Sequence, residues 1–253
     1  MIVRELDGWM YLVPQAEHAR HAALLTGYLR PEFLGPSTLR DQVVAATRHH
    51  DEGWTHWERD PARGEDGWPL NFDSIDTREH LRIWERSVVE ACRQSGAGAG
   101  AMVARHAAQL TGLHDEKAAA TFHVMGEALR REAWPKLEQE AAEARLEQSF
   151  RALFFGDAAS LLALVGWEEK LDLCLHGSGG KGHALQGRRA GEWEVEVSPW
   201  PFARAELPLL PVRAWRLPAE ADPNKLLRPG WQSREKLLTI GTRIAGPVNQ
   251  AKE

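Results

Sequence analysis

The sequence contains little cysteine, no long apolar run and no excess of basic residues. Its two cysteines, Cys92 and Cys174, lie far apart and belong to no C-x-x-C pair, which argues against a disulfide framework or a zinc ribbon. No apolar run approaches the roughly 20 residues that a membrane-spanning helix needs. The formal net charge of −5 argues against a surface that binds the phosphates of nucleic acid. We therefore expect neither a membrane nor a nucleic acid as partner.

The composition is that of an ordinary globular protein. Hydrophobic residues make up 43% of the 253 residues and charged residues 26%, so neither disorder nor a fibrous repeat is indicated. This length suits a single domain over residues 1–253. Residues 1–5 lack the charged-then-apolar order of a signal peptide, so we expect a cytoplasmic protein. A homodimer is the commonest default assembly.

Apolar periodicity predicts a mainly α fold. The dipeptide Asp7-Gly8 between two short apolar runs predicts a β-hairpin over residues 1–13. Apolar residues then recur at three- and four-residue steps through residues 14–176, which predicts a helical core. We expect Asp157 to cap the most hydrophobic helix, which would continue to Cys174. Residues 190–218 alternate with period two, so the hairpin and these C-terminal strands should form a small antiparallel β-sheet beside a helical bundle.

The segment 59–76 contains turn-forming residues too often for a regular helix or strand. Unstructured segments of this length inside a compact domain are uncommon and often serve as lids or binding loops. Trp68 and Phe72 give the segment apolar groups with which to pack. We therefore expect this loop to shape a binding site.

Metal-ligating residue types recur on the predicted helices. The chain has eleven histidines, a high count for its length. Side chains that project inward from several facing helices are how a helical bundle builds a metal site. The candidate ligands in chain order are His18, the adjacent pair His50-Asp51, His80, His106, and one acid among Glu168, Glu169 and Asp172.

The order of these residues resembles the HD-domain superfamily of metal-dependent phosphohydrolases. More narrowly, the segments QAEHA (15–19), HDEGW (50–54), EHLRIW (79–84) and RH (105–106) look like an uncharacterised bacterial family of HD-like proteins with no assigned function. The resemblance covers residues 14–176 and implies an HD-like helical bundle. It departs from the superfamily at the last position, where an aspartate is expected and Glu169 lies nearest.

The resemblance implies one or two divalent ions, whether iron, manganese, nickel or zinc. His18, His50, Asp51 and Glu169 would hold one ion, and Asp51 would bridge to a second held by His80 and His106. Two metals about 3.5–4 Å apart activate a bridging water and clamp a phosphoryl oxygen. Asp51 would then be catalytic as well as a ligand.

Further residues next to the ligands in sequence receive expected roles. Arg82 and Arg105 would neutralise phosphate charge that develops during the reaction. The substrate would contact Trp54, Trp68 and Arg78. Two more histidines, His21 and His49, would orient ligands rather than bind metal.

The leading hypothesis is therefore a metal-dependent hydrolase, specifically a phosphohydrolase of a small phosphorylated molecule. One alternative is a di-iron oxygenase on the same fold, since HD-type folds also support oxygen chemistry. Another is a module that binds a metal or a ligand without turnover. The simplest alternative is that the histidines fill the core and bind nothing.

Overall fold

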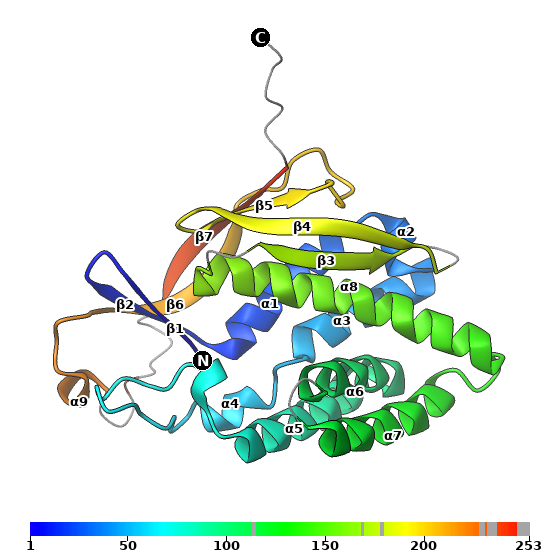
Figure 1. Ribbon diagram of the computed structural model, residues 1–253, viewed down its shortest axis with the longest axis horizontal. Coiled ribbons are helices and arrows are strands. Elements are labelled where there is room, and N and C mark those ends of the chain that lie inside the picture. The colour runs from blue at the N-terminus through cyan, green and yellow to red at the C-terminus, as the bar shows by residue number, and fades with distance from the viewer. Residues whose placement is uncertain (113–114, 168–169, 178–179, 228–230, 232–236, 247–253) are drawn as a thin grey trace, which may run out of the picture.

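The computed structural model describes residues 1–112, 115–167, 170–177, 180–227, 231 and 237–246. A curled β-sheet covers one side of two helices, α1 (Gln15–Tyr28) and the long α8 (Gln139–Val165), as Figure 1 shows. On the other side lie α5 (Thr77–Ser95), α6 (Ala97–Thr111) and α7 (Glu116–Ala133). Helices α1 and α8 thus form the middle layer of the molecule.

The shorter helices connect these layers. They are α2 (Pro31–Leu34), α3 (Ser37–His49), α4 (Trp54–Trp57), the 3₁₀ turn η1 (Phe72–Ser74) and α9 (Pro223–Leu226). Among them α3 packs against α1, α5, α6 and α8, so its C-terminal end lies where the layers meet.

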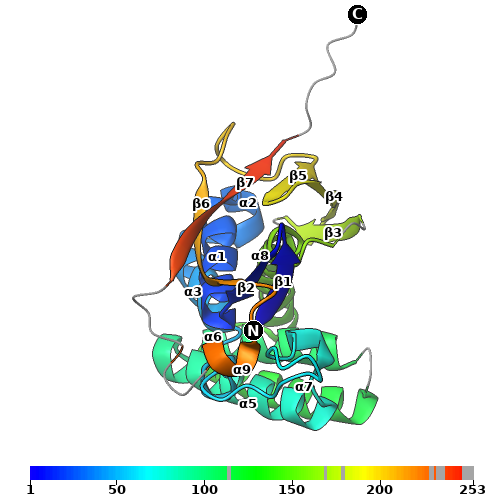
Figure 2. The same ribbon diagram turned by 90° about the vertical axis from the view of Figure 1, so that its left-hand side faces the viewer.

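Seven strands form one mixed sheet that arches over α1 and α8 (Figure 2). The strands are β1 (Ile2–Leu6), β2 (Trp9–Val13), β3 (Leu171–His176), β4 (Gly182–Gly191), β5 (Glu194–Ser198), β6 (Leu210–Pro218) and β7 (Leu238–Ala245). Their order is β1-β2-β6-β7-β5-β4-β3, and β5 and β7 run parallel while the other neighbours are antiparallel. The predicted N-terminal hairpin is confirmed, because Leu6 pairs with Trp9 across the Asp7-Gly8 turn.

The expectation of a mainly α fold with a small antiparallel sheet is wrong. The chain is about 52% helical and 22% strand, and its sheet is a seven-stranded, curled half-barrel. Two segments account for the difference. β3 was expected to be the end of the central helix, but its LDLCLH sequence alternates in burial and pairs with β4. β7 joins β6 to β5, in a stretch where the sequence shows only an amphipathic pattern.

Helix α8 is a single helix of 27 residues in which Asp157 lies well inside, so the expected cap at Asp157 is also wrong. The helix ends at Gly166, whose positive φ of 81° leaves the helical conformation. The guanidinium of Arg4 donates to the carbonyl oxygens of Ala163 and Leu164 there, which satisfies groups that the helix leaves unpaired.

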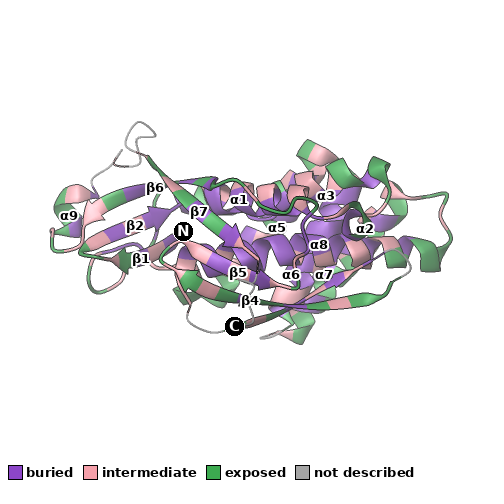
Figure 3. Ribbon diagram, turned by 90° about the horizontal axis from the view of Figure 1, so that it is seen from above, coloured by how far each residue is buried: buried purple, intermediate pink, exposed green. Residues whose placement is uncertain are grey.

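The main hydrophobic core lies between α8, α1, α3, α6 and the sheet, and Figure 3 shows α8 buried over most of its length. A second core packs Trp54, Trp57 and Trp68 against β2 and Trp215. None of the helices in the described ranges has the combination of length and apolar character needed to cross a membrane.

Candidate metal centre

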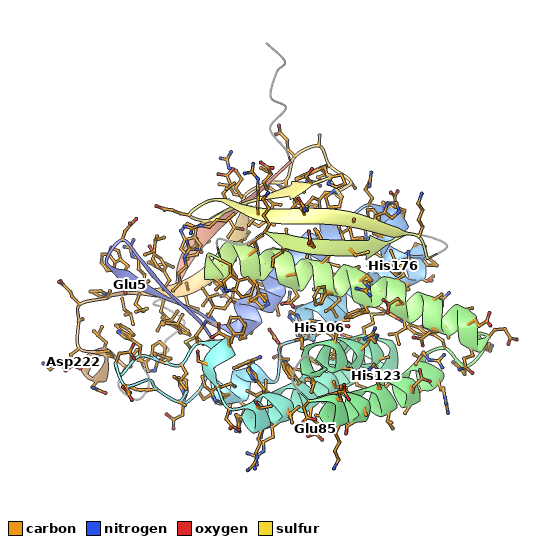
Figure 4. The ribbon with its side chains drawn as sticks, viewed as in Figure 1. Glu5, Glu85, His106, His123, His176 and Asp222 are labelled. Carbon is orange, nitrogen blue, oxygen red and sulfur yellow. The ribbon has the colours of Figure 1, made fainter. Side chains whose placement is uncertain are left out.

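Five ionisable side chains converge in the interior where α1, α3, α6 and α8 meet. Together they form the His/Asp cluster: His18, His50, Asp51, His106 and Asp157. His18 is fully buried, and the other four are at most 7% exposed. Figure 4 shows His106 between α6 and α8, in the middle of the molecule. Burial of this many ionisable groups is unusual, because a buried charge is costly unless it is paired or binds a metal.

Tight packing brings the helices close enough to form the cluster. Asp51 lies in the turn after α3, and two residues later Gly53 passes so near α5 that a Cβ there would collide with the Ile83 carbonyl oxygen. On α8, a Cβ on Gly156 would collide with the Thr26 hydroxyl on α1. A glycine is therefore required next to each of the two aspartates.

The imidazole nitrogens of the cluster point at carboxylate oxygens. His18 Nε2 lies 2.9 Å from Asp157 Oδ1, and His50 Nε2 lies 3.2 Å from the same oxygen. Asp51 Oδ2 is 3.3 Å from His50 Nε2 and 3.7 Å from His18 Nε2. His106 Nε2 is 3.5 Å from Asp157 Oδ2. One ligand atom from each of His18, His50 and Asp157 lies within 4.8 Å of the other two, so this group can hold a metal ion.

Hydrogen bonds on the far side of the His50 and His18 rings indicate where their imidazole protons lie. His50 Nδ1 lies 2.6 Å from the Thr47 carbonyl oxygen, which can only accept, so Nδ1 carries the proton. In neutral His50, Nε2 therefore carries the lone pair. That lone pair faces two carboxylates, so either a proton or a metal ion must lie between them.

His18 reaches the same state through a longer chain of hydrogen bonds. Thr242 donates to the Leu210 carbonyl and so accepts from His21 Nε2, 2.6 Å away. In neutral His21, Nδ1 then accepts from the Ser160 hydroxyl at 2.8 Å, a shorter contact than the 3.3 Å from this hydroxyl to the His18 carbonyl oxygen. Ser160 in turn accepts from His18 Nδ1 at 2.9 Å. In neutral His18 the lone pair would then lie on Nε2, toward Asp157, so here too a proton or a metal ion must lie between the two groups. We call His21, Ser160 and Thr242 the hydroxyl network.

The pKa shifts follow from this geometry. Burial raises the pKa of Asp157, but hydrogen bonds from His18 and His50 outweigh it and leave the pKa well below its usual value. Burial likewise raises the pKa of Asp51, and the charge of His50 beside it brings the net shift downward. Burial lowers the pKa of His50, yet Asp51 and Asp157 raise it well above its usual value. Both carboxylates are therefore ionised and compete for a positive charge at His50 Nε2.

The comparison with protein-family models matches residues 1–215 to the family described as Protein of unknown function (DUF3891). The chain belongs to this family. No curated protein and no solved structure matches the chain. The matched residues include the whole His/Asp cluster, together with His21 and Ser160, whereas Thr242 lies beyond them.

A cavity of about 320 Å³ opens beside the cluster. Three cluster members, Asp51, His106 and Asp157, form part of its surface. The loop 59–76 also contributes to the lining. The remaining lining residues are Gln15, Trp54, Phe72, Asp73, Ile75, Thr77, His80, Trp84, Leu110 and Leu161.

His80 lies in this cavity and outside the group of three ligand residues. Its ring stacks on Trp84 with centroids 5.0 Å apart and meets the edge of Trp54 at 5.4 Å. Burial lowers its pKa, against smaller opposing effects that include a hydrogen bond with the Phe72 backbone. A neutral His80 is thus part of an aromatic surface.

The structure brings the three candidate arginines to other surfaces. Arg78 and Arg82 are exposed on α5, and Arg82 pairs with Glu79 at 3.3 Å. Arg105 pairs with Glu147 at 3.3 Å and lies over the Phe150 ring. Their positions next to the candidate ligands in sequence do not bring them into the cavity lining.

Other candidate residues are distributed as follows. Trp54 lines the cavity, whereas Trp68 is buried in the second core. His49 lies 3.6 Å from Glu52, outside the cluster. Glu168 and Glu169 lie outside the described residues. Asp172 is exposed on β3 and accepts a hydrogen bond from Gln186.

Asp157, Ser160 and Gln15 are the site residues that sequence reasoning missed. One signal for Asp157 was available, because it is the single charged residue between Arg151 and Glu168 in an otherwise apolar stretch. A lone acid on a buried helix requires a partner, which a surface cap does not. Ser160 and Gln15 carry no comparable signal in the sequence.

Proposed function

We propose that this protein is a metal-dependent hydrolase that acts on a small phosphorylated molecule in the cavity beside the His/Asp cluster. The observation that carries the proposal is the convergence of two imidazole nitrogens and two ionised carboxylates on one buried point. Without a cation, two lone pairs and two negative charges repel one another unless a proton intervenes. A divalent ion satisfies all four groups together.

The residues that would hold this ion are His18, His50, Asp51 and Asp157. His106 lies close enough to Asp157 to contribute to a second ion. Imidazole nitrogen and carboxylate oxygen suit manganese, iron, nickel and zinc, so we propose one or two ions of this group. Such an ion, when bound, lowers the pKa of water and polarises a phosphoryl oxygen.

The order of the cluster supports the resemblance to HD-domain phosphohydrolases, whose membership is part of this proposal. That superfamily has a histidine, a His-Asp pair and a distal aspartate on a late helix. His18, His50-Asp51 and Asp157 match this order, with an aspartate rather than a glutamate in the last position. We also propose a cytoplasmic location and a homodimer.

The side chains around the cavity suit water-mediated cleavage. Asp51 and Asp157 are ionised and line the cavity, so their oxygens can orient an attacking water by accepting its hydrogen bonds. Burial lowers the pKa of His106 to about 4, so at neutral pH it adds no positive charge. Trp54 and Phe72 restrict bulk solvent at the reacting bond.

Metal content and phosphoester hydrolysis test the proposal. Purified protein should contain stoichiometric transition metal by elemental analysis, and after chelation should regain hydrolysis of p-nitrophenyl phosphate with manganese, iron, nickel or zinc. The variant Asp157→Asn should lose metal affinity by more than about 100-fold, since it removes a ligand charge. The matched control is Asp172→Asn, because Asp172 is exposed on β3.

Wild-type protein with neither bound metal nor metal-stimulated hydrolysis would overturn the proposal. Iron at two equivalents per chain, with oxygen uptake and no phosphate release, would instead favour the di-iron oxygenase. Metal binding without either reaction would indicate a non-catalytic module.

A further inference from the structure

The cavity lining is acidic and contains no basic side chain in the described part of the chain. Asp51, Asp73 and Asp157 all contribute to it, while no arginine or lysine does. Any bound metal would offset only the two aspartates of the His/Asp cluster. Asp73 would then leave the cavity with a negative charge, which disfavours a second anionic group on a ligand.

Aromatic rings form the surface next to Asp73. Trp54, Phe72 and Trp84 line the cavity, with His80 packed between the two indoles. Because the pKa of His80 is lowered, its ring is neutral and does not cancel the charge of Asp73. The negative faces of aromatic rings attract cations, and tryptophan does so most strongly.

Gln15 adds an unsatisfied polar group at the same cavity. Its side chain lines the cavity and is 1% exposed, yet its Oε1 has no hydrogen-bond partner among the described residues. A buried acceptor without a partner is costly, so a rotation of this side chain toward a ligand that donates an N–H bond would be favoured. This observation is independent of the charge of the aspartates.

Asp73 is held in place for such a contact. It lies in η1, where Asn71 Nδ2 donates to its Oδ1 at 2.9 Å and the Ser74 hydroxyl donates at 3.0 Å. These bonds fix the carboxylate beside the aromatic rings. The cavity volume of about 320 Å³ is small for a ligand site and suits a molecule of few heavy atoms.

We propose that this cavity binds a primary ammonium group between Asp73 and the aromatic rings. The substrate would then be a small amine whose other end carries the phosphoryl group, an aminoalkyl phosphate. Asp73 supplies the charge, Trp54 and Trp84 the aromatic faces, and Gln15 a hydrogen-bond acceptor. This substrate class rests on the proposed hydrolase function, while the ammonium site itself does not.

Binding to metal-free protein tests the ammonium site separately from catalysis. Ligand-observed NMR titrations would compare n-butylammonium with the near-isosteres 1-butanol and butyrate, and would be repeated with manganese-loaded protein. The ammonium ion should bind roughly 2- to 30-fold more tightly than the alcohol, the range expected for a cation on an aromatic face. Butyrate should bind metal-free protein most weakly.

Two variants locate the site. Asp73→Asn removes the charge at an exposed position, where unfolding is not expected, and should reduce the preference for ammonium over alcohol by about threefold or more. Trp84→Leu should weaken ammonium binding more than alcohol binding. The matched control is Asp60→Asn, because Asp60 is an exposed acid of the same loop outside the cavity.

The ammonium site is overturned if the alcohol or butyrate binds as tightly as n-butylammonium in metal-free protein. It is also overturned if n-butylammonium binds neither form, or if Asp60→Asn and Asp73→Asn behave alike. In manganese-loaded protein, kcat/KM should be higher for 2-aminoethyl phosphate than for n-propyl phosphate, its neutral-tailed isostere. Ammonium preference without any hydrolysis would overturn the hydrolase function and leave the ammonium site standing.

Discussion

His18 and His21 lie one turn apart on α1, are fully buried, and both contact the hydroxyl of Ser160. Their other ring nitrogens meet different groups: His18 Nε2 faces the Asp157 carboxylate, whereas His21 Nε2 faces the Thr242 hydroxyl. Carboxylates attract a cation, but a hydroxyl can only exchange hydrogen bonds. His18 is therefore suited to bind a metal ion, whereas His21 is suited to orient the His18 ring.

The same contrast appears in proton binding. The pKa of His50 in the His/Asp cluster is raised, so its contribution to stability is present below the ordinary histidine pKa and is lost as pH rises through the higher folded value. Burial lowers the pKa of His21 to about 3, so the contribution of His21 to stability depends on pH in the opposite direction. It is present above the unfolded value of 6.5 and is lost as pH falls toward 3.

The largest predicted effect is therefore on the acid stability of metal-free protein. Between pH 6.5 and pH 4 the unfolded state protonates His21 and the folded state does not, which lowers the free energy of unfolding by on the order of 3 kcal/mol. The variant His21→Gln has no such group. The free energy of unfolding of this variant, measured with urea, should be lower than that of wild type at pH 7. The difference between the two proteins should shrink as pH falls from 7 to 4.

His123→Gln is the matched control, because His123 is exposed on α7 (Figure 4). Its difference from wild type should stay near zero at every pH. A deficit of His21→Gln that is constant or grows toward pH 4 would show that His21 is protonated in the folded protein. The hydroxyl network would then be positively charged, and it would no longer differ from the His/Asp cluster in binding a proton.

The next effect concerns the residue that both histidines share. Ser160→Ala removes the acceptor of His18 Nδ1 and the donor to His21 Nδ1, so the proton on His18 is no longer directed away from the cluster. Metal affinity should fall by about 10- to 100-fold, as measured by competition with a chromophoric chelator. Ser149→Ala is the control, since Ser149 is buried on the same helix and donates only to the Arg145 carbonyl.

Equal metal affinities for the two serine variants would contradict this role of Ser160. The free energy of unfolding distinguishes a local effect from a general one. Both variants should lose about 1–3 kcal/mol, because each removes a hydroxyl from the interior. A difference in affinity at similar stability would therefore assign Ser160 to ligand orientation.

The sequence was informative where a pattern was local. The hairpin at Asp7-Gly8 depends on neighbouring residues and was predicted correctly. β3 was missed because its leucines continue the apolar spacing of α8, which ends at Val165, shortly before β3 begins at Leu171. The pairing of β7 with β5 is set by residues about 50 positions apart, which no local pattern records.

Asp157 and Arg105 show the same limit within the candidate site. An aspartate after a glycine is typical of a helix cap, and only its enclosure by α1, α3 and α6 distinguishes it from one. Arg105 precedes His106 in sequence, but consecutive residues of a helix point in different directions. The guanidinium consequently reaches Glu147 while the imidazole reaches Asp157.

The smallest predicted effect is at the outer end of the hydroxyl network, on β7. Thr242→Val keeps the shape of the side chain but leaves His21 Nε2–H without its acceptor. The variant also removes the hydroxyl that donates to the Leu210 carbonyl, so the free energy of unfolding should fall by about 1–3 kcal/mol. Metal affinity should fall less than it does in Ser160→Ala, because Thr242 acts on His18 only through two intermediates. Thr239→Val on the exposed side of the same strand should change neither quantity. If Thr242→Val weakened metal binding as much as Ser160→Ala, the strand would determine the state of His18 directly, and the sheet would belong to the metal site.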